Sequence, residues 1–148
     1  MGVIYDYFAA ASDERAAETI GLVGGPGEAG FRTLMVKGID PVVQLRTLES
    51  LLTGVDYDVV AQNPRAGHTL AIRDEGEGAV CTITEELRDA MTRATPQQLK
   101  AVAGPWSQTE EFGGRGDPRT LAEFLHDLSG LARLAHQGKE QLYCWICV

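Results

Sequence analysis

The sequence has no feature of a membrane or exported protein. No apolar run approaches the ~20 residues that a helix needs to cross a bilayer. The segment Met1 to Asp6 has neither the basic start nor the long apolar stretch of a signal peptide. Asp6 also stands where an N-myristoylation motif requires Ser or Thr. We therefore expect a cytoplasmic protein that makes no contact with a membrane.

Cysteine and positive charge are also scarce. The three cysteines are an odd number, which does not suit the paired framework of a secreted disulfide-rich protein. The chain has 13 Lys and Arg against 21 Asp and Glu, a formal net charge of -8. Such a chain repels phosphate and has no basic stripe, so we expect no nucleic-acid partner. The same acidity suits a protein partner with a basic surface.

The composition is that of one globular domain. Of the 148 residues, 44% are hydrophobic and 23% are charged. A chain of this length buries about 70% of its surface in a single core. No linker, internal repeat or low-complexity tract divides the sequence. We predict one domain over residues 1–148.

Strands are predicted where short apolar or alternating runs are rich in aromatic and β-branched residues. Two such runs, Val3 to Ala9 and Glu140 to Val148, stand at the two ends of the sequence, and we expect both inside one sheet. Phe31 to Lys37 can form a short strand or an extended lead-in to the next helix. His68 to Arg73 and Ala79 to Ile83 read as a hairpin, with Leu70, Ile72 and Val80 joining the same core.

Helices are predicted from capping residues and from apolar residues at helical spacing. The predicted helices, with their caps, are Ser12 to Ile20, Asp40 to Gly54, Asp56 to Gln62, Thr84 to Arg93, Thr95 to Gly104 and Asp117 to Gly138. The second presents a face of Leu45, Leu48 and Leu52, which Leu51 widens. The last has the longest apolar stripe and is expected to be the main core helix. Its stripe consists of Leu121, Phe124, Leu125, Leu128, Leu131, Ala132 and Ala135.

Two segments have no regular pattern. Gly21 to Gly30 has five glycines and a proline and is predicted to be a loop. Trp106 to Gly116 is expected to be irregular or only briefly helical. Helices and strands do not alternate regularly along the chain. We therefore predict an α+β fold: a mixed or antiparallel sheet that includes the N- and C-terminal strands, packed against several helices.

Several short segments occur together in a familiar order. Met1-Gly2-Val3-Ile4 is followed closely by Tyr5 and Tyr7, and Ile39-Asp40 leads into a leucine-rich helix ending Leu51-Leu52-Thr53-Gly54. Ile83-Thr84-Glu85-Glu86-Leu87 then opens a helix, and Trp106 precedes the long last helix. In this order the chain resembles the YfbM-like family of small bacterial proteins of uncharacterised function. The resemblance implies an α+β fold and supplies no catalytic residue, since members look like interaction or accessory proteins as much as enzymes.

Cys144 and Cys147 form a Cys-x-x-Cys motif. A redox motif of this kind needs its first cysteine at a helix N-terminus, which lowers the thiol pKa. Here the motif lies in a predicted strand, where residues three apart point to opposite faces. A structural zinc site needs about four ligands, and His68, His126 and His136 do not repeat at ligand spacing. We expect no metal and no cofactor.

Two other groups of residues are candidates for a site. Glu110 and Glu111 are adjacent carboxylates beside Trp106 and Phe112, in a segment that core periodicity does not explain. The carboxylates are the catalytic candidates and the two rings are binding candidates.

The second group consists of Tyr5 and Tyr7, which are binding candidates on the first strand. If the first and last strands are neighbours, these tyrosines share one region of the sheet with Tyr143 and Trp145.

Three functions follow from these candidates. The first is a non-enzymatic binding or accessory module that recognises another protein. The second is a small hydrolase-like enzyme with a site near Trp106 to Phe112. The third is a thiol or metal protein that uses Cys144 and Cys147. We take the first as the main hypothesis.

Overall fold

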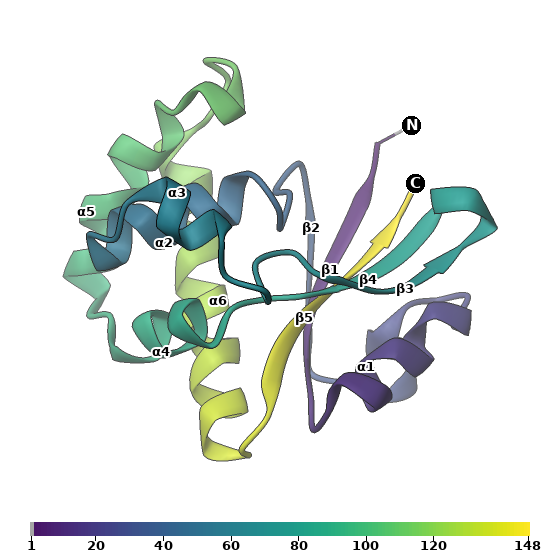
Figure 1. The fold of residues 1–148 in the computed structure, drawn as a ribbon. Helices are drawn as coiled ribbons and strands as arrows, with labels where there is room; N and C mark the ends of the chain where they lie inside the picture. The colour runs from purple at the N-terminus through teal and green to yellow at the C-terminus, as the bar shows by residue number, and fades with distance from the viewer. Residues whose placement is uncertain (1) are drawn as a thin grey trace.

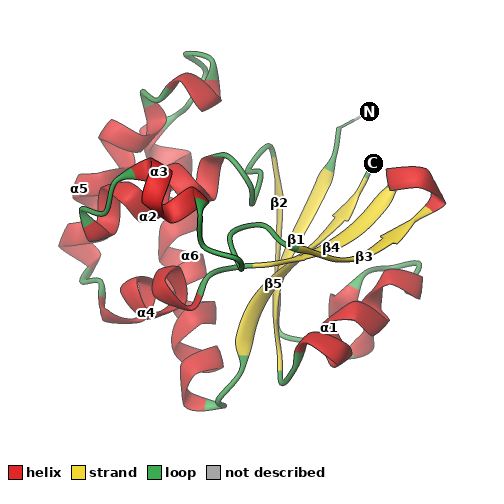
Figure 2. Ribbon diagram, viewed as in Figure 1, coloured by secondary structure: helices red, strands yellow, loops and turns green. Residues whose placement is uncertain are grey.

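The structure, a computed structural model, describes residues 2–148 and contains one five-stranded antiparallel sheet (Figures 1 and 2). The strand order is β2-β1-β5-β4-β3. The strands are β1 (Ile4–Ala10), β2 (Thr33–Lys37), β3 (Thr69–Arg73), β4 (Gly78–Thr82) and β5 (Gln141–Cys147). The α+β prediction is confirmed, and so is the inclusion of both terminal strands in one sheet.

The first and last strands lie at the centre of the sheet. β1 and β5 pair antiparallel over seven residues, from Ile4 opposite Cys147 to Ala10 opposite Gln141. Alternation along these two strands divides their side chains between two layers. Tyr7 and Cys144 face one layer, and Phe8 and Tyr143 face the other.

The larger layer is helical and covers one face of the sheet (Figure 1). Its helices are α2 (Gln44–Thr53), α3 (Tyr57–Ala61), α4 (Glu85–Arg93), α5 (Pro96–Ser107) and α6 (Pro118–Gln137). The predicted stripe of α6 is confirmed, because all seven of its residues are buried. Asp117, Thr84 and Thr95 cap their helices with side-chain oxygens as predicted, and Thr95 forms the reciprocal capping box with Gln98.

A smaller layer covers the other face of the sheet (Figure 2). It consists of α1 (Asp13–Glu18), capped by Ser12, and the short 3₁₀ helices η1 (Thr19–Gly21) and η2 (Pro26–Ala29). The indole N–H of Trp145 donates to the carbonyl of Thr19 at 3.0 Å, which ties η1 to the central strand. The prediction of an unstructured loop over residues 21–30 is therefore wrong in part, because η2 forms there and buries Pro26.

Two helices differ from the predictions. α5 does not end near Gly104 but continues through Pro105 to Ser107. Proline lacks the donor for a helical hydrogen bond, but Trp106 is fully buried and its indole N–H donates to the carbonyl of Gln44 at 3.0 Å. The burial of this large ring stabilises the extra turn.

In α2, Gly54 ends the helix with a φ of +76°, as predicted. Regular α-helix begins only at Gln44, because Asp40 caps a preceding turn by accepting hydrogen bonds from the amides of Val42 and Val43. Leu51 is 41% exposed and does not widen the buried face. At ~100° per residue it lies about 240° around the helix from Leu45.

The hairpin β3–β4 is confirmed, but one of its faces is not as predicted. The register shifts between Thr69 and Ala71, a bulge that disrupts the alternation of side chains. Leu70 therefore packs with Val80 in the smaller layer. Ile72 lies opposite Ala79 and points to the other face of the sheet, on which the helical layer packs. The 3₁₀ helix η3 (Asp74–Gly76) joins the two strands.

Asp6 is a charged residue inside the smaller layer, where only 3% of it is exposed. Its Oδ1 has no hydrogen-bond partner within residues 2–148. Gly25 packs against it so closely that a Cβ at that position would lie 2.7 Å from Asp6 Oδ2. Burial away from water raises the pKa of Asp6.

This burial predicts a pH-dependent effect of Asp6→Asn. A carboxyl whose pKa is higher in the folded than in the unfolded state loses stability as pH rises from about 4 through the folded pKa. We expect Asp6→Asn to raise the free energy of unfolding at pH 7 by roughly 1 kcal/mol. In urea unfolding, the gain should disappear below about pH 4. The exposed Asp127→Asn provides the control for net charge, and an equal gain in both variants would contradict the assignment to burial.

Candidate functional site

The helical layer leaves one end of the sheet uncovered. The strand ends that carry the termini and the β3–β4 hairpin project beyond the helices (Figure 1). One row of directly paired residues crosses all five strands at this end. We call it the sheet row: Val36, Tyr5, Ile146, Ala79 and Ile72. All five point to the face of the sheet on which the helical layer packs, because directly paired residues point to the same side.

The sheet row is apolar and incompletely buried. Four of its residues are half-buried, and Ile72 on the outer strand is 64% exposed. The half-buried hydroxyl of Tyr5 lies beside Asp40, and desolvation, followed by the charge of Asp40, raises the pKa of Tyr5. An apolar strip of this kind at the surface marks an interaction site in many soluble proteins.

Acidic residues border one end of the sheet row. Asp74, Glu75 and Glu77 follow Ile72 in the hairpin turn, and all three are exposed. The adjacent cation, Arg73, forms an ion pair with Asp74 at 3.3 Å. Arg73 lies opposite Gly78 and so points to the other face of the sheet. The border of the row is therefore negatively charged.

The predicted segment around Trp106 does not form an open site. Trp106 is buried between helices, and Phe112 packs edge-on against it with ring centroids 5.2 Å apart. Glu110 is exposed in the 3₁₀ helix η4 (Glu110–Phe112). Glu111 accepts a hydrogen bond from Thr47 at 3.0 Å. The two rings thus contribute to the core, and the assignment of a role to the two carboxylates stays a prediction.

The two cysteines of the C-terminal motif point to opposite faces of the sheet, as strand geometry predicts. Cys144 is buried under the helical layer, while Cys147 is half-buried against the smaller layer. The residue directly opposite Cys144 is Cys81, and burial is the main cause that raises the pKa of Cys144. All three cysteines are free thiols. Cys144 and Cys147 therefore do not share one side as a redox or metal-binding pair would.

The histidines are exposed: His68 directly precedes β3, and the other two lie on α6. The Nδ1 atom of His136 lies 3.9 Å from Oδ1 of Asp89. His126 lies on the solvent side of α6, as predicted. Across residues 2–148, no three His, Cys, Asp or Glu side chains gather closely enough to hold a metal ion.

The four aromatic residues of the central strands are separated. Tyr5 and Tyr7 face the helical layer, but Tyr143 and Trp145 face the smaller layer. Tyr7 donates to the carbonyl of Ile39 at 2.5 Å and is fully buried, so it is a core residue. The prediction that these rings share one region is wrong. In the register of β1 and β5, the residue opposite Trp145 is Asp6 and not a tyrosine, so the two pairs of rings face opposite sides of the sheet.

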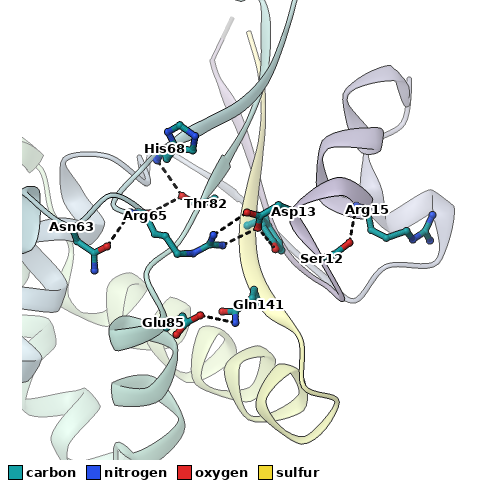
Figure 3. Close-up of polar contacts among 10 residues, drawn as sticks. Ser12, Asp13, Arg15, Asn63, Arg65, His68, Thr82, Glu85 and Gln141 are labelled. Carbon is teal, nitrogen blue, oxygen red and sulfur yellow. Dashed lines mark hydrogen bonds and ion pairs between the residues drawn. The ribbon is translucent and has the colours of Figure 1, made fainter.

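A polar cluster joins the smaller layer to the sheet (Figure 3). Arg65 donates two hydrogen bonds to the carboxylate of Asp13, at 3.0 and 3.1 Å. Tyr143 donates to the same carboxylate at 2.7 Å. Thr82 donates to the carbonyl of Arg65 at 2.7 Å and accepts from the amide of His68. Arg65 Nε is buried and has no acceptor among the described residues. The other groups satisfy one another, so the cluster holds α1 in place and leaves few free donors or acceptors for a ligand.

A second surface feature was absent from the sequence predictions. A pocket of about 320 Å³ lies among α2, α3 and α4. We call it the acidic pocket; its lining is Glu49, Thr53, Val55, Val59, Val60, Asn63, Glu86, Asp89 and Arg93. Glu49 gives the one signal that could have identified it from the sequence. At ~100° per residue it lies about 40° from Leu45, on the apolar face of α2.

Comparisons with known proteins add no relative. No family model matches the chain, and neither a curated protein nor a solved structure matches it. Among the described residues, no helix is both long enough and apolar enough to span a bilayer.

The polar cluster predicts a pH-dependent effect of Asp13→Asn. Hydrogen bonds from Arg65, and next from Tyr143, lower the pKa of Asp13 against the opposing effect of desolvation. A carboxylate with a lowered folded pKa stabilises the fold above its unfolded pKa of about 3.9, and this contribution is lost as pH falls through the folded value. We expect Asp13→Asn to lower the free energy of unfolding at pH 7 by about 1 kcal/mol, a figure reduced for solvent screening. In urea unfolding, the loss should shrink as pH falls below about 4.

The matched control for this prediction is Glu18→Gln. It breaks the Arg15–Glu18 pair, whose side chains are 58% and 65% exposed. We expect a change of less than ~0.5 kcal/mol. Equal losses in the two variants would show that the polar cluster has no special role.

Proposed function

We propose that this protein is a non-enzymatic binding module that recognises a protein partner with a basic surface. The observation that carries the proposal is the sheet row, an apolar strip from five strands that ends at the exposed Ile72. Contact with a partner would remove this strip from water. The acidic hairpin turn beside it and the net charge of -8 favour a partner of opposite charge.

The enzymatic alternative has less in its favour. The predicted catalytic carboxylates are an exposed Glu110 and a Glu111 bound to Thr47, and neither has a histidine as hydrogen-bond partner. The thiol alternative is weakened by the opposite directions of Cys144 and Cys147. The YfbM-like resemblance is compatible with the binding proposal and stays a proposal itself, as does a cytoplasmic location.

The proposal predicts that Ile72→Asp weakens partner binding. Burial of one isoleucine side chain contributes about 1.5–3 kcal/mol, so we expect at least about a tenfold loss of affinity. Val23→Asp, at a position 95% exposed in the smaller layer, is the matched control and should leave affinity unchanged. Glu75→Lys, in the hairpin turn, should weaken binding most at low salt.

The partner for this measurement is found by photo-crosslinking in cells of the source organism. A photoreactive residue at position 72 should crosslink a basic protein that the same residue at position 23 does not reach. Binding of that purified protein is then measured for each variant. A crosslink to a second copy of this chain, or an affinity unaffected by Ile72→Asp, would overturn the proposal.

A further inference from the structure

The acidic pocket is formed by three short helices and is separate from the sheet row. α2 contributes Glu49 and Thr53, the region of α3 contributes the valines and Asn63, and α4 contributes Glu86, Asp89 and Arg93. One wall is therefore aliphatic, and the other two carry three acidic residues and one arginine. The volume of about 320 Å³ is at the lower end of the range for small-ligand pockets.

Glu49 is the unusual residue of this pocket. It is only 5% exposed, yet no ion pair with a cation exists for it within residues 2–148. Its Oε1 accepts a hydrogen bond from Thr84, and no donor among the described residues reaches Oε2. Burial, and to a lesser degree the charge of Glu86, raise the pKa of Glu49, while the Thr84 hydrogen bond lowers it. A buried carboxylate without a counter-charge is costly to the fold.

The other charges of the pocket do not neutralise Glu49. Glu86 is exposed and accepts from the side-chain amide of Asn63 at 3.1 and 3.3 Å. Asp89 pairs with Arg88 at 2.9 Å. Arg93 is exposed and makes no ion pair with a described carboxylate. Three of the four charged residues in the lining are therefore carboxylates, and among the described residues only Asp89 of these three forms an ion pair.

The aliphatic wall indicates that a cationic ligand of this pocket would also carry an apolar part. Val59 is 56% exposed and Val55 is 41% exposed, although both line the pocket. An alkyl chain of a few carbons would cover these surfaces, as the stems of Lys and Arg do elsewhere.

We propose that the acidic pocket binds an aliphatic cation, an alkylammonium or alkylguanidinium group. The head would bind Glu49 and Glu86, and the alkyl stem would pack on Val55 and Val59. Such a group occurs in free amines and in the Lys and Arg side chains of polypeptides. The inference goes beyond the proposed function and does not depend on the sheet row.

The test is a titration of the ¹⁵N-labelled protein followed by two-dimensional NMR. The probes are n-butylammonium and n-butylguanidinium, with the neutral n-butanol as the control ligand. We expect both cations to shift the amide signals of α2, α3 and α4 at millimolar concentration, and butanol to bind at least about tenfold more weakly. Equal shifts by butanol, or no shift with either cation, would overturn the proposal.

Variants locate the binding to the pocket. Glu49→Gln keeps the size and the acceptor for Thr84, and we expect affinity to fall at least about tenfold. Should that variant not fold, the exposed Glu86→Gln should still weaken binding severalfold. Arg93→Gln should strengthen binding, because it removes a cation from the lining. Glu123→Gln, an exposed change on α6, is the matched control. An affinity equal to that of the unaltered protein in both Glu49→Gln and Glu86→Gln would overturn the assignment.

A blocked Gly-Lys-Gly peptide distinguishes the two sources of the cation. Tighter binding of the peptide than of n-butylammonium supports a polypeptide side chain as the ligand, and weaker binding supports a free amine. Ile72→Asp should leave all these titrations unchanged, since Ile72 is not part of the pocket lining. Failure of this proposal is therefore distinguishable from failure of the sheet-row proposal.

Discussion

The antiparallel pairing of β1 with β5 is the constraint on which the rest of the structure depends. Because both strands are central, each must supply apolar side chains to two layers at once. This requirement accounts for their nearly continuous apolar sequences. It also explains why β5 can hold two cysteines without bringing their sulfurs together. The helical layer and the smaller layer are then fixed by which of the alternate residues each one covers.

Three acidic residues show that the pKa of a carboxyl depends on its burial and on the donors around it. Asp13 lies at the edge of the smaller layer, where Arg65 and Tyr143 supply donors, and its pKa is lowered. Asp6 and Glu49 lie deeper, in environments with few or no donors, and their pKa values are raised. The direction of each shift follows from the partners and not from the residue type. Asp6 is closed off by Gly25, whereas Glu49 borders a pocket, and this difference separates a structural charge from a candidate binding group.

Local signals in the sequence were sufficient for much of the fold. The stripe of α6, the caps at Thr84 and Thr95 and the terminal strands depend on residues a few positions apart, so periodicity and capping rules predict them. The errors come from contacts between distant residues. The extra turn of α5 depends on the burial of Trp106 against α2. The direction of the Ile72 side chain depends on a β-bulge that no residue type in the sequence predicts.

The candidate sites also depend on contacts between residues that are far apart in the sequence, and such contacts are not visible in local patterns. The sheet row consists of residues from five strands that only their register brings together. Glu49 was detectable in principle as a charge within an apolar helical face, but its lack of a counter-charge required the positions of α3 and α4. Trp106 and Phe112 looked unusual because they lie in a segment without the periodicity of a helix or a strand. In the structure, the two rings pack against each other in the core region.

The positions of the three thiols have a consequence for the motions of the molecule. Cys81 and Cys144 lie opposite each other beneath the helical layer, and Cys147 lies on the other side of the sheet. A thiol reagent reaches the first two only when the helices separate from the strands, and burial keeps Cys144 protonated until then. The rate at which these thiols are alkylated in the native protein therefore measures how often the helical layer opens, with the half-buried Cys147 as an internal reference.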